Sequence, residues 1–409
     1  MDTIITKLYE KMMTGYLMLL RSNKTLLRLS SIQLLCYFGA WFSHMGIYTL
    51  LINLQAPIWA LSAAAAFTFL PSMLLAPFSG ALIDKIDTKK FMLFLTLIEI
   101  VTVFFLIFID SLEGIWFLLA LIFVRMGTGS IYFQTEMSLL PKLLNNEDLK
   151  VANEIHSIIW SISYALGMAL AGLFIHYFGT TLSFIVDMII YLIGFYLLLG
   201  LDIPSIAQKS IANVWEMIGS GYAYLKTNPK IMHLILLHAS VGFTAYDALI
   251  ALLADYQYKH LLSISLIMGF INASRALSLV LGQFFLSLHV SHKTLFMIFL
   301  LQGFSIILWG VLQYNFYLSF VGIFLSGLFT TTIWSYTYTL IQYETDEAFY
   351  GRVIAYNDMV FMGMSTLVSL MIGFLFEQGV PLWSITCFLG LVFIVFGFYW
   401  KWIQKEELL

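Results

Sequence analysis

Charge is what this chain has least of. Asp, Glu, Lys and Arg make up 11% of its 409 residues, while 61% are hydrophobic; soluble domains carry about 25% charged residues. Cysteine is also scarce, and because Cys36 and Cys387 both lie in apolar runs, no disulfide framework is expected. The net charge of −3 offers no basic surface for nucleic acid. These shortages argue against a soluble or nucleic-acid-binding protein and predict an integral membrane protein.

The sequence also lacks the motifs of several catalytic classes. It has no phosphate-binding loop for ATP, no nucleophile–base set and no zinc cluster, so neither an enzyme nor a cofactor is expected. Residues 1–28 contain Glu10 and several lysines without a cleavable apolar core, unlike a secretory signal. We expect them to form a cytoplasmic, amphipathic segment on the membrane surface.

Long apolar runs fill most of the remaining chain. A transmembrane helix needs about 20 mostly apolar residues, and twelve runs have suitable lengths: 29–53, 57–82, 91–110, 114–138, 152–176, 180–201, 231–256, 262–287, 293–313, 316–341, 353–376 and 381–402. The longest polar interval divides them six and six. We therefore expect an all-α membrane protein with these parts: one six-helix bundle at 29–201, a cytoplasmic central loop at 202–230, a second bundle at 231–402 and a cytoplasmic tail at 403–409.

Lysine and arginine fall on alternate loops. They precede the first run and follow every even-numbered run, whereas the opposite loops contain only Lys259. Because positively charged loops stay in the cytoplasm, both termini are predicted to be cytoplasmic. The two halves also echo each other: "KVANEIHSIIWSI" enters the fifth run and "RVIAYNDMVFMGM" enters the eleventh. Paired halves of this kind are typical of transporters built around a central cavity.

The loop after the second run carries a recognisable pattern, "GALIDKIDTKKFML". It resembles the 2–3 loop signature of the major facilitator superfamily, whose places are taken by Gly80, Asp84, Lys85, Lys89 and Lys90. The Asp87 variant resembles the branch of bacterial enterobactin exporters and related transmembrane secretion permeases, as do "LLPKLLNNEDLKVANEIHSIIWSISYALGMALAG" and "GRVIAYNDMVFMGMSTLVSLMIGFL". The resemblance implies the twelve-helix fold of that family and transport by alternating access.

This loop is expected to act as a conformational latch. Asp84 ends the second run, where a carboxylate can meet the positive N-terminus of another helix, and the eleventh run, beginning after Arg352, is the expected partner. The lysines can anchor the same end at the anionic leaflet. The alternative is a topology anchor alone, which would need the lysines but neither acid.

Ionisable groups inside the runs are costly in a bilayer and therefore candidates for function. Arg125 begins "RMGTG", which resembles a second family signature tied to proton movement, and Glu136 lies about three turns further on the same helix. We interpret both as proton-coupling residues, the alternative for Arg125 being a structural brace. Glu99 and Asp187 are expected to be structural partners, and Asp358 fits either role.

The second half offers its own candidates. Asp247 and Arg275 reach similar depths in the seventh and eighth runs and are expected to pair, either permanently or as a switch. His44 and His238 lie on equivalent helices, where they could bind a divalent metal together with Asp247, titrate near neutral pH, or serve as hydrogen-bonded cavity residues.

Taken together, these features predict a secondary transporter of the bacterial cytoplasmic membrane. We expect a monomer embedded in the lipid bilayer that exports an amphipathic small molecule, drug-like or siderophore-like, in exchange for protons. A divalent metal exporter and an uncoupled facilitator are the alternatives. Two departures bear on proton coupling: Met168 replaces a family proline in "GMALAG", and Ala40 replaces an acidic or polar residue.

Overall fold

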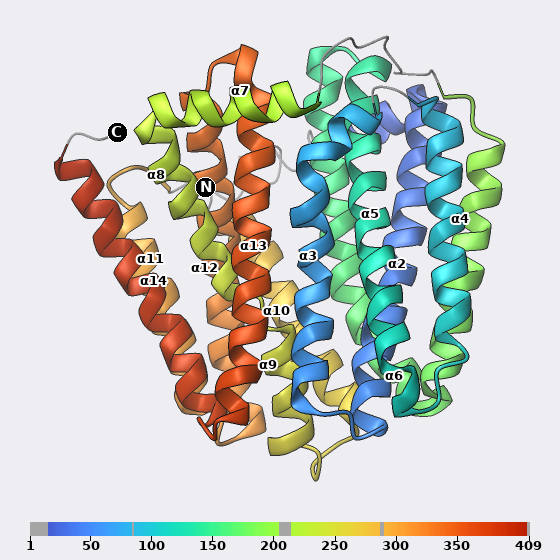
Figure 1. The fold of residues 1–409 in the computed structure, drawn as a ribbon, viewed down its shortest axis with the longest axis vertical. Helices are drawn as coiled ribbons and strands as arrows, with labels where there is room; N and C mark the ends of the chain where they lie inside the picture. Colours follow the sequence, from blue (N-terminus) through green and yellow to red (C-terminus); the bar gives the residue numbers. More distant parts are fainter. Residues whose placement is uncertain (1–14, 84–85, 204–213, 287–289, 407–409) are drawn as a thin grey trace, which may run out of the picture.

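The computed structural model describes residues 15–83, 86–203, 214–286 and 290–406, in which helices dominate and no strand is found (Figure 1). The first half contains α2 (Lys24–Asn53), α3 (Ile58–Ile83), α4 (Thr88–Leu106), η1 (Leu112–Gly114), α5 (Ile115–Leu143) and α6 (Asn146–Leu199). After α7 (Val214–Thr227), the second half contains α8 (Pro229–Ala239), η2 (Ser240–Thr244), α9 (Asp247–Leu252), η3 (Leu253–Gln257), α10 (Ile264–Leu286), α11 (Leu295–Leu312), α12 (Phe316–Glu344), η5 (Glu347–Phe349), α13 (Tyr350–Glu377) and α14 (Leu382–Lys405).

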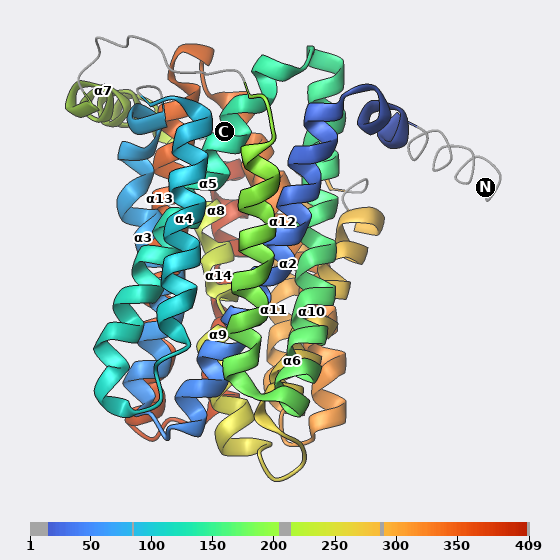
Figure 2. The same ribbon diagram turned by 90° about the vertical axis from the view of Figure 1, so that its right-hand side faces the viewer.

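These helices supply the twelve predicted crossings. Ten described segments are long and apolar enough to cross a membrane. One of them contains two crossings, because Gly179 within α6 has a φ of 81° and breaks the helix. The two limbs of α6 stand side by side in Figure 2 and meet at the end opposite α7. The remaining crossing is α4, whose 19 residues include Lys89, Lys90 and Glu99.

The helices form two bundles. In Figure 1, α2 to α6 lie on the right and α8 to α14 on the left, while α7 lies across one end. The central loop is therefore partly helical, and α7 is held there by the Tyr356 hydroxyl, which donates to the Ile218 carbonyl at 2.9 Å. The first crossing begins at Lys24 rather than at residue 29, because Asn23 accepts a hydrogen bond from the Leu26 amide and caps the helix there.

The two bundles pack directly against each other at the end opposite α7. A Cβ added to Gly172 of α6 would lie 2.6 Å from the Ser265 carbonyl oxygen and 3.0 Å from the Gly269 Cα of α10. On the other side of the molecule, Gly373 of α13 lies against Ser62 of α3. Small residues of this kind let helix backbones come together in membranes, so this end is closed by direct helix packing.

Candidate functional site

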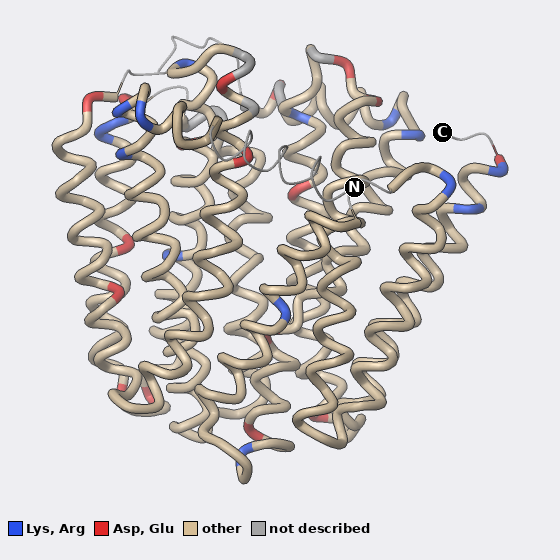
Figure 3. The backbone as a smooth tube through the Cα atoms, turned by 180° about the vertical axis from the view of Figure 1, so that it is seen from behind, with Lys and Arg blue, Asp and Glu red and all other residues tan. Residues whose placement is uncertain are grey.

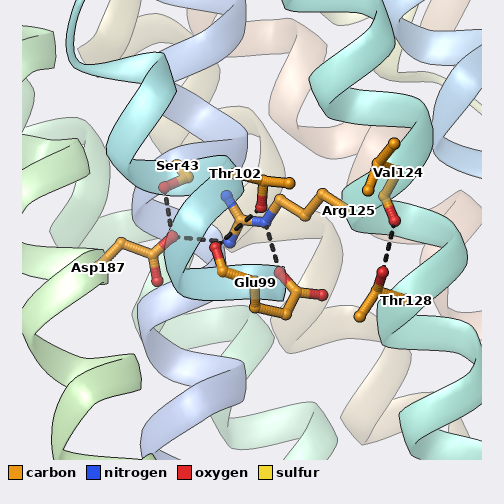
Figure 4. Close-up of polar contacts among 7 residues, drawn as sticks. All are labelled: Ser43, Glu99, Thr102, Val124, Arg125, Thr128 and Asp187. Atoms are coloured by element: carbon orange, nitrogen blue, oxygen red, sulfur yellow. Dashed lines mark hydrogen bonds and ion pairs between the residues drawn. The ribbon is translucent and has the colours of Figure 1, made fainter. Parts of the chain in front are cut away.

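A buried charge cluster lies inside the first bundle (Figure 4). Arg125 of α5 places Nη2 2.7 Å from Oδ2 of Asp187 on α6 and Nε 3.1 Å from Oε2 of Glu99 on α4. The side chains of Arg125 and Glu99 are 6% exposed and that of Asp187 is fully buried. Glu99 and Asp187, which were expected to be structural partners, are both ion-pair partners of Arg125.

The helix α2 completes this cluster. The hydroxyl of Ser43 donates to Asp187 Oδ2, so this carboxylate oxygen accepts from both the arginine and the serine. A Cβ at Gly39 would lie 2.8 Å from Asp187 Oδ1, which shows that the glycine admits α2 to this distance. No feature of the sequence indicated Ser43, because a hydroxyl on an apolar helix is common and only the fold brings it to Asp187.

The cluster carries unequal charge. One guanidinium faces two carboxylates, so full ionisation would leave one uncompensated negative charge among buried groups. Such a charge is very costly in a low-dielectric interior, and the usual outcome is that a group takes up a proton. Two carboxylates that share one site behave in the same way. The arrangement can therefore hold one exchangeable proton.

Glu136 does not belong to this cluster. It is 3% exposed, and its Oε2 has no hydrogen-bond partner among the described residues. Eleven residues bring a side chain back to the same helix face, but they also move it about 16 Å along the axis. Glu136 therefore lies outside this cluster, and its role as a proton-coupling residue stays a prediction.

A second polar centre joins the two bundles. Nε2 of His44 on α2 lies 3.7 Å from Oδ1 of Asp247 on α9, and the two side chains are 14% and 15% exposed. Ser43 and His44 are consecutive, so they leave α2 about 100° apart and face different partners. One helix therefore touches both the buried cluster and the contact between the bundles.

The helix that carries Asp247 is interrupted. The sequence predicted one continuous crossing at 231–256, but α8 ends at Ala239, a 3-10 turn follows, and Ala245 has a ψ of 75° before α9 begins. Gly242 lies inside the turn, where a Cβ would be 2.9 Å from Met364 Cβ and from the Ser365 amide nitrogen of α13. Interrupted helices that line binding sites are characteristic of transporters.

Arg275 donates a hydrogen bond to the backbone at this interruption. Its Nη2 donates to the Thr244 carbonyl at 2.7 Å, and its guanidinium lies 4.8 Å from the centre of the Tyr246 ring. No ion pair with Asp247 forms between the described side chains, which corrects the expected pair. The reason is that the broken helix offers Arg275 a free carbonyl, while Asp247 faces His44 of the other bundle. The charge of Arg275 still acts on Asp247.

The remaining candidates lie apart from both centres. His238 is fully buried, shares a 2.8 Å hydrogen bond with Thr337, and is packed among aromatic rings. Asp358 accepts a hydrogen bond from Asn357 at 3.2 Å. Across the part of the chain that the structure describes, no three His, Cys, Asp or Glu side chains are placed to hold a metal ion. His44, His238 and Asp247 therefore do not form the metal site considered from the sequence.

The latch loop is only partly visible. Gly80 lies in the last turn of α3, whereas Asp84 and Lys85 lie outside the described residues. Asp87 is the N-cap of α4 and accepts from the Lys90 amide at 3.1 Å, and Lys89 donates to the Leu199 carbonyl at 2.9 Å. The second acid of the loop thus has a local capping role, and the latch at Asp84 stays a prediction.

Comparison with known proteins agrees with this architecture. A family model, Major Facilitator Superfamily, matches residues 29–292. The "Putative bacilysin exporter BacE" of Bacillus subtilis is 26% identical over 204 residues, which is 48% of this chain and 51% of that protein. The "Uncharacterized MFS-type transporter YvqJ" of Bacillus subtilis (strain 168) is 25% identical over 169 residues, 41% of this chain and 40% of that protein. The chain thus spans about half the length, or less, of these curated relatives.

Solved structures show the same fold over nearly the whole chain. The crystal structure of the nucleoside transporter NupG has a TM-score of 0.72 at 16% identity, covering 94% of this chain and 100% of that one. A POT family transporter in complex with a thioalcohol-conjugated peptide has a TM-score of 0.70 at 13% identity, covering 93% and 96%. With more than half of its length matched by the family model, the chain belongs to the major facilitator superfamily, and it shares its multi-pass membrane fold with these solved structures.

Proposed function

We propose that this protein is a proton-coupled exporter that moves an amphipathic small molecule out of the bacterial cytoplasm by alternating access. The observation that carries the proposal is the buried cluster of Arg125 with Glu99 and Asp187, because its charge is balanced only when one carboxyl group is protonated. The resemblance to an exporter, BacE, supports the direction of transport.

Glu99 is the member of the cluster that we assign to carry the proton. Asp187 accepts hydrogen bonds from both Arg125 and Ser43, which favour its ionised form. Glu99 meets Arg125 through one ion pair, 3.1 Å from Nε to Oε2, and this contact does not have the geometry of a hydrogen bond. The less well stabilised carboxylate is the one that gains the proton.

The orientation of the protein follows from its charge distribution. Figure 3 shows most Lys and Arg residues at the end where α7 lies, whereas Lys259 belongs to the loop between η3 and α10. By the positive-inside rule the end with α7 faces the cytoplasm, and with it both termini. The end closed by Gly172, Gly269 and Gly373 then faces outward, as it does when an exporter loads its substrate. We place the protein in the cytoplasmic membrane as a monomer.

Two measurements test this function. In inside-out vesicles with an imposed pH gradient, acridine orange reports loss of the gradient when a transported compound is added. A panel of amphipathic dyes, siderophores and short peptides should contain a compound that collapses the gradient with wild-type protein but not with Glu99→Gln. If a compound of the panel is transported at a rate that depends on neither the gradient nor the membrane potential, the protein is an uncoupled facilitator instead.

The shared proton can also be observed without a substrate. Infrared spectra of the purified protein should contain a band of a protonated carboxyl group that disappears at high pH and is absent from Glu99→Gln. Asp358→Asn is the matched control, because Asp358 is an intramembrane acid outside the cluster. A spectrum of Glu99→Gln identical to that of the wild type would contradict the assignment.

A further inference from the structure

The contact between the bundles places an acid and a guanidinium near each other without joining them. Asp247 and Arg275 both belong to the second bundle, and Arg275 influences Asp247 electrostatically, yet among the described side chains the carboxylate faces His44 and the guanidinium faces a backbone carbonyl. In a permanent structural pair the carboxylate of Asp247 and the guanidinium of Arg275 would be in direct contact, because a buried charge without its partner is costly. The two charges are thus kept separate inside the membrane.

The carboxylate of Asp247 is incompletely satisfied. Its contact with His44 is 3.7 Å long, which exceeds the length of a hydrogen bond, and the imidazole carries a charge only when it is protonated. With His44 neutral, Asp247 has negative charge available for a cation. Both side chains retain some exposure, 14% and 15%, so the contact is not sealed from small molecules.

The guanidinium of Arg275 has unused donors. An arginine has five N–H groups in a planar fork. Arg275 commits Nη2 to the Thr244 carbonyl, has the Tyr164 hydroxyl as a further hydrogen-bond partner, and rests against the face of the Tyr246 ring. The fork suits a carboxylate, which it can bind through two parallel hydrogen bonds. The Thr244 carbonyl and the Tyr246 ring fix its direction, so little side-chain freedom remains to be lost on binding.

Aromatic and amide groups from both bundles frame the two charges. Trp41 and Tyr48 lie edge-on to His44, with ring centres 5.5 and 5.2 Å away. Trp41 is also 4.6 Å from Tyr164, whose hydroxyl donates to Asn272 at 3.2 Å. The buried Trp41 Nε1 has no hydrogen-bond partner among the groups described. Indole and phenol rings favour ammonium groups and also accept apolar side chains.

We propose that Asp247, Arg275 and the rings around them form a binding site for a zwitterion, an amino acid or short peptide with free termini. The ammonium group binds Asp247 and the carboxylate binds Arg275. A purely cationic or purely anionic molecule would satisfy one of these charges and leave the other unmatched. The inference rests on the proposed transport function and names the substrate class of the central site.

Binding of defined peptides to the purified protein tests this site. The probes are Ala-Ala, N-acetyl-Ala-Ala and Ala-Ala-amide, with Ala and Ala-Ala-Ala to vary the distance between the termini. At least one free zwitterion should bind with a Kd about ten-fold or more below those of both blocked dipeptides, a difference of about 1.4 kcal/mol. Equal affinity for free and blocked forms, or no binding of any probe, would overturn the proposal.

Two variants assign the ends of the ligand. Asp247→Asn should abolish the preference over the N-acetyl form and keep the preference over the amide, and Arg275→Gln should do the reverse. Asp358→Asn is the matched control and should retain both preferences. If both preferences survive in either site variant, the assignment of the charges is wrong. Should a variant fail to fold, the comparison of free and blocked peptides on the wild-type protein still decides.

The result is independent of proton coupling. Binding is measured in detergent, without a membrane or a gradient, so an uncoupled facilitator would still show the zwitterion preference if the site is as described. Conversely, gradient-driven export of a non-zwitterionic dye together with equal binding of all peptides would retain the proposed function and reject this site.

Discussion

Corresponding helices of the two bundles are joined by different chemistry. In the first bundle the third and fourth crossings, α4 and α5, are connected by the ion pair of Glu99 and Arg125. In the second bundle the equivalent helices, α11 and α12, are connected by Gln302, whose Nε2 donates to Thr330 Oγ1 at 2.9 Å. The sixth crossing contributes Asp187 in the first bundle, whereas its counterpart α14 contributes Thr386, which accepts from Gln313 at 2.8 Å.

The difference separates packing from proton chemistry. Amides and hydroxyls hold buried helices together without any requirement for charge balance, and the second bundle shows that this is sufficient for the fold. Because a buried ionic cluster contributes little to stability compared with neutral packing, we infer that the charges of the first bundle serve transport. Variants that change the charged groups of the first bundle, or their neutral counterparts in the second, test this inference.

Removing the arginine should have the largest effect. In Arg125→Gln the two carboxylates lose their shared counter-charge, and breaking a buried pair in this way costs about 3–5 kcal/mol. We expect a clearly lowered thermal unfolding temperature in detergent and complete loss of gradient-driven transport. Wild-type stability in this variant would show that the cluster is more hydrated than its 0–6% exposure indicates.

Converting the whole cluster to neutral groups should separate stability from function. The triple variant Glu99→Gln, Arg125→Thr, Asp187→Asn imitates the chemistry of the second bundle. Replacement of an entire buried ionic cluster is often nearly neutral for stability, so most of the stability lost in Arg125→Gln should return, while gradient-driven transport stays absent. Restored transport in the triple variant would refute proton coupling through this site.

Removing the serine should have an intermediate effect. Ser43→Ala deletes one of the two hydrogen bonds that favour the ionised form of Asp187, at a cost of about 1–3 kcal/mol for a buried acceptor. The two acids then compete more equally for the proton, so the pH dependence of transport should shift towards higher pH. Ser183→Ala is the control, because Ser183 donates to the Phe42 carbonyl of the same helix and not to the cluster.

Changing the neutral counterpart should have the smallest effect. In Gln302→Leu, Thr330 keeps its hydrogen bond to the Ser326 carbonyl, so the loss should be about 1 kcal/mol and the pH dependence of transport should match the wild type. If the pH dependence of transport changed as strongly in Gln302→Leu as in Glu99→Gln, the inferred difference in function between the two bundles would be wrong.

Much of the architecture could be predicted from hydropathy and charge. The twelve crossings and the two bundles follow from the apolar runs, because a bilayer imposes both the length and the helical form on each crossing. The break in the seventh crossing was missed, since "SVGFTAYD" has no proline and a single glycine. It is the packing of α13 against Gly242 that stabilises this break.

The site residues were predicted less completely. Arg125, Asp247 and His44 were recognisable because ionisable groups inside a membrane are rare. Glu99 and Asp187 were expected to be structural partners, but the sequence did not show which of these groups would meet. Glu136 lies about three turns along α5 from Arg125, outside the cluster. Arg275 donates to a backbone carbonyl at the break in the helix instead of pairing with Asp247.

By itself, the sequence determined that the chain crosses the membrane repeatedly and that few ionisable groups lie within the crossings. It also placed most positive charges on alternate loops, from which the positive-inside rule predicts the cytoplasmic face. Those properties depend on each helix separately, because every crossing must satisfy its own backbone in lipid. The tertiary structure alone decided which charges meet. The buried cluster combines residues of three helices, Glu99, Arg125 and Asp187, and the second centre combines His44 and Asp247 of two bundles. Their contacts therefore depend on the rotation and depth of each helix. Only the packing of glycines and large side chains between the helices determines these.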